Sequence, residues 1–273
     1  MAVVVTKMKP LLAGILALSA AVLPAAVKIE HKQNTRGQIE ANTYRVLNAS
    51  PVRYSINYNI RTKDGVRTVG DRSASSTGIG LNNGWYANGF LRIYVDGKSL
   101  TVPAARTVGD GVLVFKWDKA VLKMHFPEGS DKIYCEISAP GVRRLKIGFL
   151  AVPGFLPKRK DEFKPYVSTA KVNHLLTDGK YQSAGESWFM LYDGISNRNG
   201  IPAVILDPAE IKSGVVSGSA KTLLITAHFE MNRPVCRFIV MGFPNSHLDA
   251  ESFYEDLKAN GKKYLEELKS FRF

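Results

Sequence analysis

The acidic and aromatic residues of segment 185–194, GESWFMLYDG, are the best candidates for carbohydrate chemistry in this chain. Hydrolysis of a glycosidic bond uses two carboxylates across a cleft, and Glu186 and Asp193 flank Trp188 and Tyr192. In an extended strand Glu186 shares a face with both aromatics, whereas Asp193 points to the other face. Asp-Gly is also a strong turn pair, so a turn role fits Asp193 better than catalysis. We therefore predict ligand binding by Trp188 and Tyr192, and keep Glu186 and Asp193 as candidate catalytic acids.

A second set of residues would suit the elimination of a uronate-containing polysaccharide. In that reaction a Tyr, His, Lys or Arg removes a proton beside the carboxylate, and nearby cations neutralise the carboxylate. His174 lies in a segment without a clear period, which makes it the best histidine candidate, although a single histidine is more often structural. The densest basic cluster is Lys158, Arg159 and Lys160. We predict that this cluster contacts the ligand, with a solvated loop as the alternative.

Two adjacent aromatics, Trp85 and Tyr86, lie among Asn and Gly residues just before the segment LRIYV at 91–95. That segment alternates like a strand, with its Leu, Ile and Val on the core face. Extending the alternation backward places Trp85 with the core face and Tyr86 with the polar face. Trp85 is therefore predicted to be a corner of the core, and Tyr86 a platform for a flat ligand.

Common catalytic and metal-binding motifs are missing from the sequence, which has no GxSxG, no GxxxxGK, no CxxC and no HxxxH. We predict neither a metal site nor a cofactor. The chain has two cysteines, Cys135 and Cys236, each on the apolar face of a predicted strand. A disulfide between them would close a loop of about 100 residues and stabilise the fold by ~4–5 kcal/mol. Two free buried thiols are the alternative, because Cys behaves as a small hydrophobic residue.

Residues 1–26 have the order of a secretory signal peptide. Lys7 and Lys9 precede an apolar run, and small residues follow it; Met8 is an alternative start. The run is shorter than the ~20 residues that a spanning helix needs, which favours cleavage over an uncleaved anchor. No cysteine lies near the cleavage region and no second apolar run of spanning length follows. We therefore expect a secreted or periplasmic protein with neither a lipid anchor nor a membrane span after cleavage.

The formal net charge of +13 indicates an acidic partner. For an exported protein, acidic polysaccharide, lipopolysaccharide or an anionic lipid surface is a more natural partner than nucleic acid. The basic residues are widely scattered, so the alternative is that they only solubilise the outer faces of strands. The sequence does not determine the oligomeric state.

Hydrophobic residues alternate with polar ones over most of the chain, as in VRYSINYNIR at 52–61. Asp-Gly turns and short strands follow one another without any βαβ alternation. We predict an all-β fold, a large antiparallel two-sheet β-sandwich formed by a single domain over residues 27–273. Residues 153–187 show no strong period and are predicted to be an irregular loop. Residues 247–271 are predicted to form one amphipathic C-terminal helix with Ser246 and Asp249 at its start.

The chain resembles exported β-sandwich proteins of carbohydrate-degrading bacteria in three features: its leader, the strand NGFLRIYVDGKSL, and the closing VCRFIVMGFP before a capped helix. In size the chain is similar to the supersandwich of the galactose-mutarotase-like group. That resemblance covers residues 28–245, implies the same sandwich fold and a carbohydrate ligand, and transfers no functional residue. Our leading interpretation is an exported protein that binds carbohydrate, with an anionic polysaccharide as one option. The alternatives are a polysaccharide lyase or sugar epimerase of the mutarotase kind, and a structural envelope protein with no small ligand.

Overall fold

The computed structural model describes residues 27–69, 78–81, 89–100, 102–103, 105–153, 162–176, 179–197, 200–219, 222–242 and 249–273. The predicted signal peptide, residues 1–26, lies outside these ranges. The described chain is mostly strand, with one α-helix near its C-terminal end, and every strand pairing among the described residues is antiparallel.

The strands form three hydrogen-bonded sheets. The five-stranded sheet has the order β1 (Lys28–Arg36), β2 (Ile39–Leu47), β3 (Ser55–Lys63), β4 (Val66–Val69), with β5 (Gly80–Leu81) also paired to β3. The nine-stranded sheet has the order β14 (Asn173–Leu175), β13 (Pro165–Thr169), β16 (Trp188–Asp193), β17 (Ala203–Leu206), β20 (Val235–Met241), β11 (Lys132–Ser138), β10 (Ala120–His125), β9 (Val112–Trp117), β8 (Ala105–Gly109). The six-stranded sheet has the order β15 (Lys180–Gln182), β18 (Ile211–Ser219), β19 (Leu224–Met231), β12 (Leu145–Ala151), β6 (Leu91–Val95), β7 (Lys98–Ser99).

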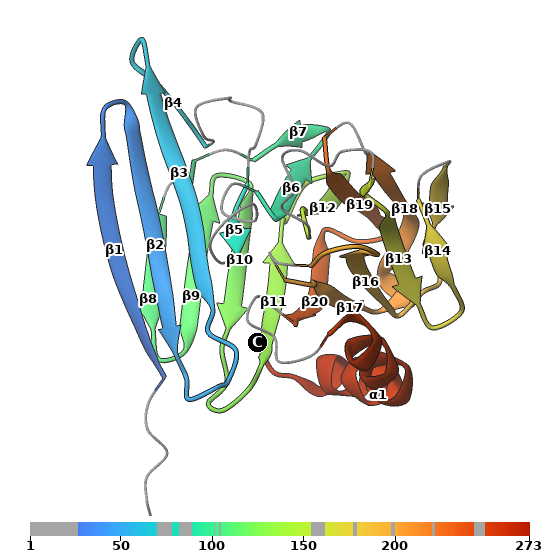
Figure 1. Cartoon of the computed structure of the whole chain (residues 1–273). Coiled ribbons are helices and arrows are strands. Elements are labelled where there is room, and N and C mark those ends of the chain that lie inside the picture. Colours follow the sequence, from blue (N-terminus) through green and yellow to red (C-terminus); the bar gives the residue numbers. More distant parts are fainter. Residues whose placement is uncertain are drawn as a thin grey trace, which may run out of the picture.

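The nine-stranded sheet is one layer of a sandwich, and the two smaller sheets together make the other layer (Figure 1). The five-stranded sheet packs on the β8–β10 half of the nine-stranded sheet, where the ring of Phe115 meets the ring of Tyr44 edge-on, with centroids 6.0 Å apart. The six-stranded sheet packs on the other half of the nine-stranded sheet, where the ring centroids of Phe149 and Phe238 are 5.3 Å apart. A bridge from Ile79 to Leu91, with two backbone hydrogen bonds of 2.9 Å, connects the smaller sheets. The predicted all-β sandwich is therefore confirmed.

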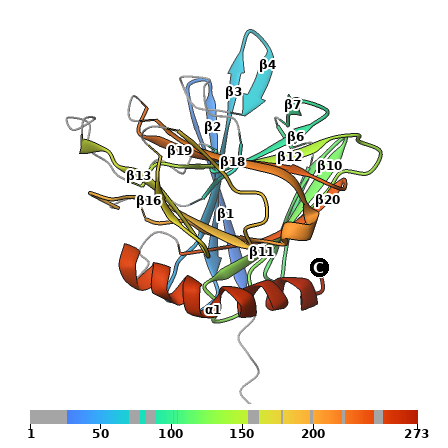
Figure 2. The ribbon, with the colours of Figure 1, turned by 90° about the vertical axis from the view of Figure 1, so that its right-hand side faces the viewer.

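The alternation of side chains explains why these segments are strands. Buried and less buried residues alternate strictly along β6, β10 and β19, which places one apolar face in the core and one polar face toward solvent. By contrast, β16 and β17 are buried on both faces, because helix α1 (Ala250–Ser270) covers the outer side of the nine-stranded sheet. Figure 2 shows α1 crossing that sheet on the side away from β18 and β19.

Helix α1 begins at Ala250, three residues after the predicted start at 247; Asp249 of the predicted capping box is its N-cap, and Ser246 lies outside the described residues. The side chain of Asp249 accepts a hydrogen bond of 2.8 Å from the backbone N–H of Ser252. Buried Phe253, Leu257 and Leu268 then face the sheet. Between them, Gly261 lies so close to the sheet that a Cβ there would be 2.5 Å from the indole of Trp188. The helix is therefore a third layer over part of the sandwich.

The segment 153–187 is more regular than predicted. Its described part contains β13, β14 and β15, which extend the edges of the nine-stranded and six-stranded sheets. β14 and β15 have only three residues each, and every residue of β14 is exposed, so neither strand carries a readable alternation. Among the described residues, no helix combines the length and the apolar character that a membrane crossing requires.

Candidate functional site

The structure tests only part of the predicted ligand-binding set. Tyr86, together with Trp85, and the basic cluster Lys158, Arg159 and Lys160 lie outside the described residues. The other predicted residues are placed by β13 to β16, and they do not form one cleft.

Trp188 is in the core, so the prediction that it stacks on a sugar is wrong. Its side chain is 2% exposed and lies between the nine-stranded sheet and α1. The ring contacts the backbone of Gly261 and lies 6.1 Å from the ring of Tyr254. The sequence pattern placed Trp188 and Tyr192 on the same face of the strand, and α1 covers that face at Trp188.

Tyr192 lies at the edge of the area covered by the helix and is half-buried. Its ring stacks on that of Tyr166, the residue opposite on β13, with centroids 5.1 Å apart and planes 16° apart. Its hydroxyl donates a hydrogen bond of 2.9 Å to Oδ1 of Asn173. Burial raises the pKa of Tyr192. The tyrosine is held in place by its neighbours, and its predicted role in ligand binding remains a prediction.

The structure brings the catalytic candidates Glu186 and His174 together through a third residue, Tyr181. The carboxylate of Glu186, 4% exposed, accepts a hydrogen bond of 3.1 Å from the Tyr181 hydroxyl and lies 3.3 Å from Nζ of Lys171. The ring of His174 lies 5.5 Å from that of Tyr181. These contacts connect the β13–β14 turn to β15 and give the buried charge of Glu186 its partners. The arrangement is a link between two sheet edges and favours a structural role.

Asp193 has the turn role that the sequence favoured. It is 2% exposed, and its carboxylate accepts hydrogen bonds of 3.0 Å from the backbone N–H groups of Lys164 and Ile195. Burial raises the pKa of Asp193, while these hydrogen bonds lower it. The carboxylate fixes the end of β16 against the start of β13.

Both cysteines are free thiols in the main core. Cys135 on β11 and Cys236 on β20 are fully buried on neighbouring strands. They are not opposite each other, because Cys135 is opposite Phe238 and Cys236 is opposite Ile137. The sequence left a disulfide and two free buried thiols as alternatives, and in the structure both thiols are free. No group of three or more His, Cys, Asp or Glu in the described ranges could hold a metal ion.

The strongest candidate site lies elsewhere, on the outer face of the six-stranded sheet. We call it the cationic face and define it by Arg92, Tyr94, Arg144, Lys146, Lys212, His228 and Glu230. Alternation along β6, β12 and β19 turns these side chains away from the core. Register then aligns them: Lys146 on β12 is opposite Tyr94 on β6 and Glu230 on β19, and Gly148 is opposite Arg92 and His228.

The aromatic and basic groups of the cationic face lie close together. Nζ of Lys146 is 5.5 Å from the ring centre of Tyr94, and the rings of Tyr94 and His228 are 6.1 Å apart at 66°. The imidazole lies directly over Gly148, where an added Cβ would be 2.8 Å from its Nδ1. A groove of about 240 Å³ beside these residues is lined by Tyr94, Gly97, Arg144, Lys146 and Glu230.

Basic groups outnumber acidic ones on this face. Glu230 pairs with Lys212 at 2.9 Å and with Arg144 at 3.6 Å. The hydrogen bond from Lys212, followed by the charges of Lys212 and Arg144, holds the pKa of Glu230 below its ordinary value. Lys146 and Arg92 have no such acidic partner within this set of seven residues, so the face carries an excess of positive charge.

His228 is neutral at physiological pH. Burial, followed by the charges of Lys146 and Arg92, lowers its pKa to about 4. Its Nδ1 is enclosed and has no hydrogen-bond partner among the described residues. The cationic face thus combines a neutral imidazole with a groove lined by a tyrosine ring and basic side chains, which is a suitable set for an acidic sugar.

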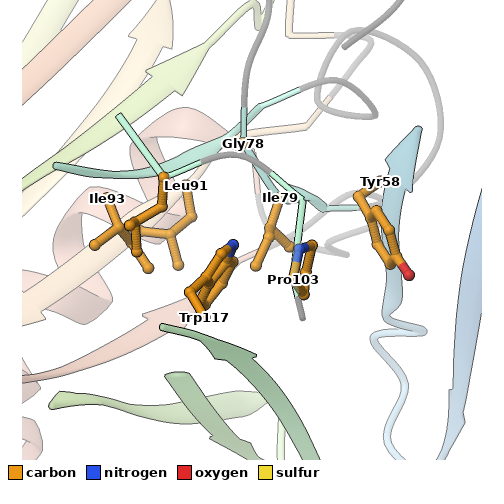
Figure 3. Close-up of a pocket in the computed structure, with 8 residues that line it drawn as sticks. Tyr58, Gly78, Ile79, Leu91, Ile93, Pro103 and Trp117 are labelled. Atoms are coloured by element: carbon orange, nitrogen blue, oxygen red, sulfur yellow. The ribbon is translucent and has the colours of Figure 1, made fainter. Parts of the chain in front are cut away.

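An apolar pocket near β3, β6 and β9 is too small for a ligand (Figure 3). Its volume is about 10 Å³, roughly the space of a single water molecule. Its walls are Tyr58, Gly78, Ile79, Leu91, Ile93, Leu100, Pro103 and Trp117. The pocket is a small gap in the core between the sheets, and we do not consider it a binding site.

Sequence reasoning missed the cationic face although part of its signal was readable. The strand LITAHFEM places His228 and Glu230 on one face, and LRIYV places Arg92 and Tyr94 on one face. What the sequence could not show is that β12 lies between these two strands and adds Lys146. The choice of His174 rested on its position in an apparently irregular segment, and the structure does not place it near this face.

No known protein family matches the chain, and no curated protein matches it in sequence. Among solved structures it is similar to the GH36 alpha-galactosidase AgaB from Geobacillus stearothermophilus, with 9% identity, a TM-score of 0.37, and coverage of 80% of this chain and 41% of that one. It is also similar to a 4-alpha-glucanotransferase from Thermococcus litoralis, with 10% identity, a TM-score of 0.34, and coverage of 79% and 39%. The chain thus spans about two fifths of either structure, and similarity at this level assigns neither a family nor a function.

Proposed function

We propose that this protein is an exported β-sandwich that binds an acidic polysaccharide on the cationic face. The observation that carries the proposal is the groove itself, whose lining includes Tyr94 and Arg144, with Nζ of Lys146 5.5 Å from the ring centre of Tyr94. Export follows from the predicted signal peptide, and the net charge of +13 favours acidic partners over neutral ones.

The chemistry of the groove fits a chain of acidic sugars. Arg and Lys side chains make charge-assisted hydrogen bonds with carboxylate or sulfate groups, and a tyrosine ring packs on the apolar side of a pyranose. Because Glu230 already pairs with Lys212 and Arg144, it orders these cations and leaves Lys146 for the ligand. Lys146 is exposed to solvent, so dissolved salt screens its attraction for the ligand, and affinity should fall as salt concentration rises.

The test is calorimetric titration with polygalacturonate, with neutral dextran as the reference ligand. We expect the Lys146→Ala variant to bind polygalacturonate at least about tenfold more weakly, the effect of losing one charge-assisted contact. Lys116→Ala is the matched control, since Lys116 is exposed on the nine-stranded sheet and the variant removes the same charge. Equal losses in both variants would show that only net charge matters, and no binding by the unmodified protein would refute the proposal.

A second candidate function is β-elimination or epimerisation at the same groove. The observation that favours it is His228, an imidazole that stays neutral beside two cations and is therefore able to accept a proton near a bound carboxylate. The test is the ultraviolet absorbance of an unsaturated uronate product, with His228→Gln as the inactive control. If the protein neither binds nor transforms any glycan, a structural role in the cell envelope is the remaining alternative.

A further inference from the structure

His228 has a place in ligand binding that goes beyond contact with a sugar. We propose that His228 takes up a proton when an anionic group binds on the cationic face, so that the face binds acidic ligands more tightly in mildly acidic solution than at neutral pH. This inference rests on the proposed function and adds a regulation of the same site.

The first step is the position of the ring among the strands that surround it. From β12, Gly148 lies beneath the ring and Lys146 lies one alternation further along the same face. From β6 come Arg92, opposite Gly148, and Tyr94, whose ring is 6.1 Å away.

The other flank of the ring is apolar. On β18 the residue opposite His228 is Val215, and the nearest charged group of that strand is Lys212. On β19 itself the charged neighbour is Glu230, two residues on, which is engaged with Lys212 at 2.9 Å and with Arg144 at 3.6 Å. The charges that face the imidazole are therefore mostly positive, with one acid whose charge is already compensated.

The second step is the effect of this surrounding on the free protein. Burial, Lys146 and Arg92 together hold the pKa of His228 at about 4, so the imidazole of the free protein is mostly neutral at pH 5 and above. Two of these three causes are cations that an anionic ligand would neutralise. Burial, the largest cause, remains in the complex, but a carboxylate or sulfate bound at Lys146 offsets the two positive charges and therefore raises the pKa of His228 above its value in the free protein.

The third step is the sign and size of the linkage. Because the pKa is higher in the complex than in the free protein, affinity rises as pH falls through the pKa of the complex, and levels off below the pKa of the free protein. The upper limit is a pKa in the complex equal to the ordinary value of about 6.5, at which affinity is on the order of thirtyfold higher at pH 5 than at pH 8. At pH 5.5 the protein then takes up close to one proton for each ligand group bound.

The ligand chemistry is an oxygen anion on a polysaccharide, and it has two natural sources, a uronate carboxylate and a sulfate ester. Polygalacturonate and dextran sulfate separate them. Sulfate esters do not titrate between pH 5 and pH 8, so a pH dependence measured with dextran sulfate belongs to the protein. Binding of polygalacturonate alone identifies uronate as the ligand group, and binding of dextran sulfate alone identifies sulfate; in each case the pH response is read from the ligand that binds.

The experiment is calorimetric titration of the full mature protein with each polymer at pH 5.5 and pH 8, in two buffers of different ionisation enthalpy. We expect uptake approaching one proton at pH 5.5, none at pH 8, and an affinity higher by up to about tenfold at the lower pH. His228→Gln should show neither the proton uptake at pH 5.5 nor a gain in affinity between pH 8 and pH 5.5. Glu230→Gln is the second variant, and it should keep the uptake, which assigns the proton to the histidine.

The outcomes separate the two proposals. If neither polymer binds at either pH, the proposed function is refuted and this inference with it. If a polymer binds equally at both pH values without proton uptake, only this inference is overturned. Proton uptake that survives in His228→Gln also overturns it, because the proton then belongs to another group.

Discussion

The close approach of His228 to Gly148 leads to a prediction that depends on a single added methyl group. In Gly148→Ala the new Cβ would lie 2.8 Å from Nδ1 and 3.0 Å from Cε1 of His228, well inside normal contact. The next atom, Cε2 of Tyr94, is 3.6 Å away, which is an ordinary contact. The imidazole is therefore the only one of these neighbours that must move.

Two opposing effects set the size of the change. Forcing a methyl group into a packed site costs about 1–3 kcal/mol. Replacing Gly by Ala inside a strand gains roughly 0.5–1 kcal/mol, because the unfolded chain loses freedom. We expect Gly148→Ala to lower the free energy of unfolding by about 1–2 kcal/mol in the native sequence. In a His228→Ala background the clash is gone, and the same substitution should be neutral or stabilising by up to about 1 kcal/mol.

The assay is urea-induced unfolding of the four proteins of this double-mutant cycle at pH 7, where the imidazole is neutral and only its shape matters. The expected coupling between positions 148 and 228 is about 1–3 kcal/mol. Gly109→Ala is the matched control, because an added Cβ at Gly109 meets nothing within 4 Å. A coupling near zero would refute the packing of His228 on Gly148 and, with it, the fixed ring on which the proton-uptake proposal depends.

Two further predictions concern the core. Gly261→Ala improves helix propensity by about 1 kcal/mol, but its Cβ would lie 2.5 Å from the buried indole of Trp188. We expect a net loss of about 1–2 kcal/mol in denaturant unfolding, and a variant more stable than the native protein would contradict this packing. Burial raises the pKa of the Cys135 and Cys236 thiols, so a thiol reagent at pH 8 should label neither in the folded protein and both after unfolding without reductant. Rapid labelling of the folded protein, or no thiols in the unfolded one, would contradict the free, buried pair.

Local patterns predicted most of the architecture. Alternation identified the strands that carry Arg92, Tyr94 and His228, and the capping-box pattern of Ser246 and Asp249 predicted the start of the helix to within three residues. Alternation is a local property, because successive side chains of a strand point to opposite faces whatever the strand pairs with. The same rule failed for β14, whose three residues are all exposed at the edge of a sheet.

The candidate site was less accessible to the same reasoning. Alternation placed Trp188 and Tyr192 on one face of their strand, but the sequence does not show that α1 returns to cover that face. His174 was predicted from its position in a segment without a clear period, and Glu186 from its place beside Trp188 and Tyr192. Both residues join sheet edges through Tyr181 instead of forming a cleft.

By itself the sequence determined an all-β chain, the face of each long strand that enters the core, the capped C-terminal helix and an excess of positive charge. These features follow from residue type and from spacing over a few positions. Only the tertiary structure decided that β12 lies between β6 and β19, which brings Lys146 beside Tyr94 and places Gly148 under His228. Strand order depends on contacts between segments far apart in the chain, and those contacts create the charges and the close approach that define the site.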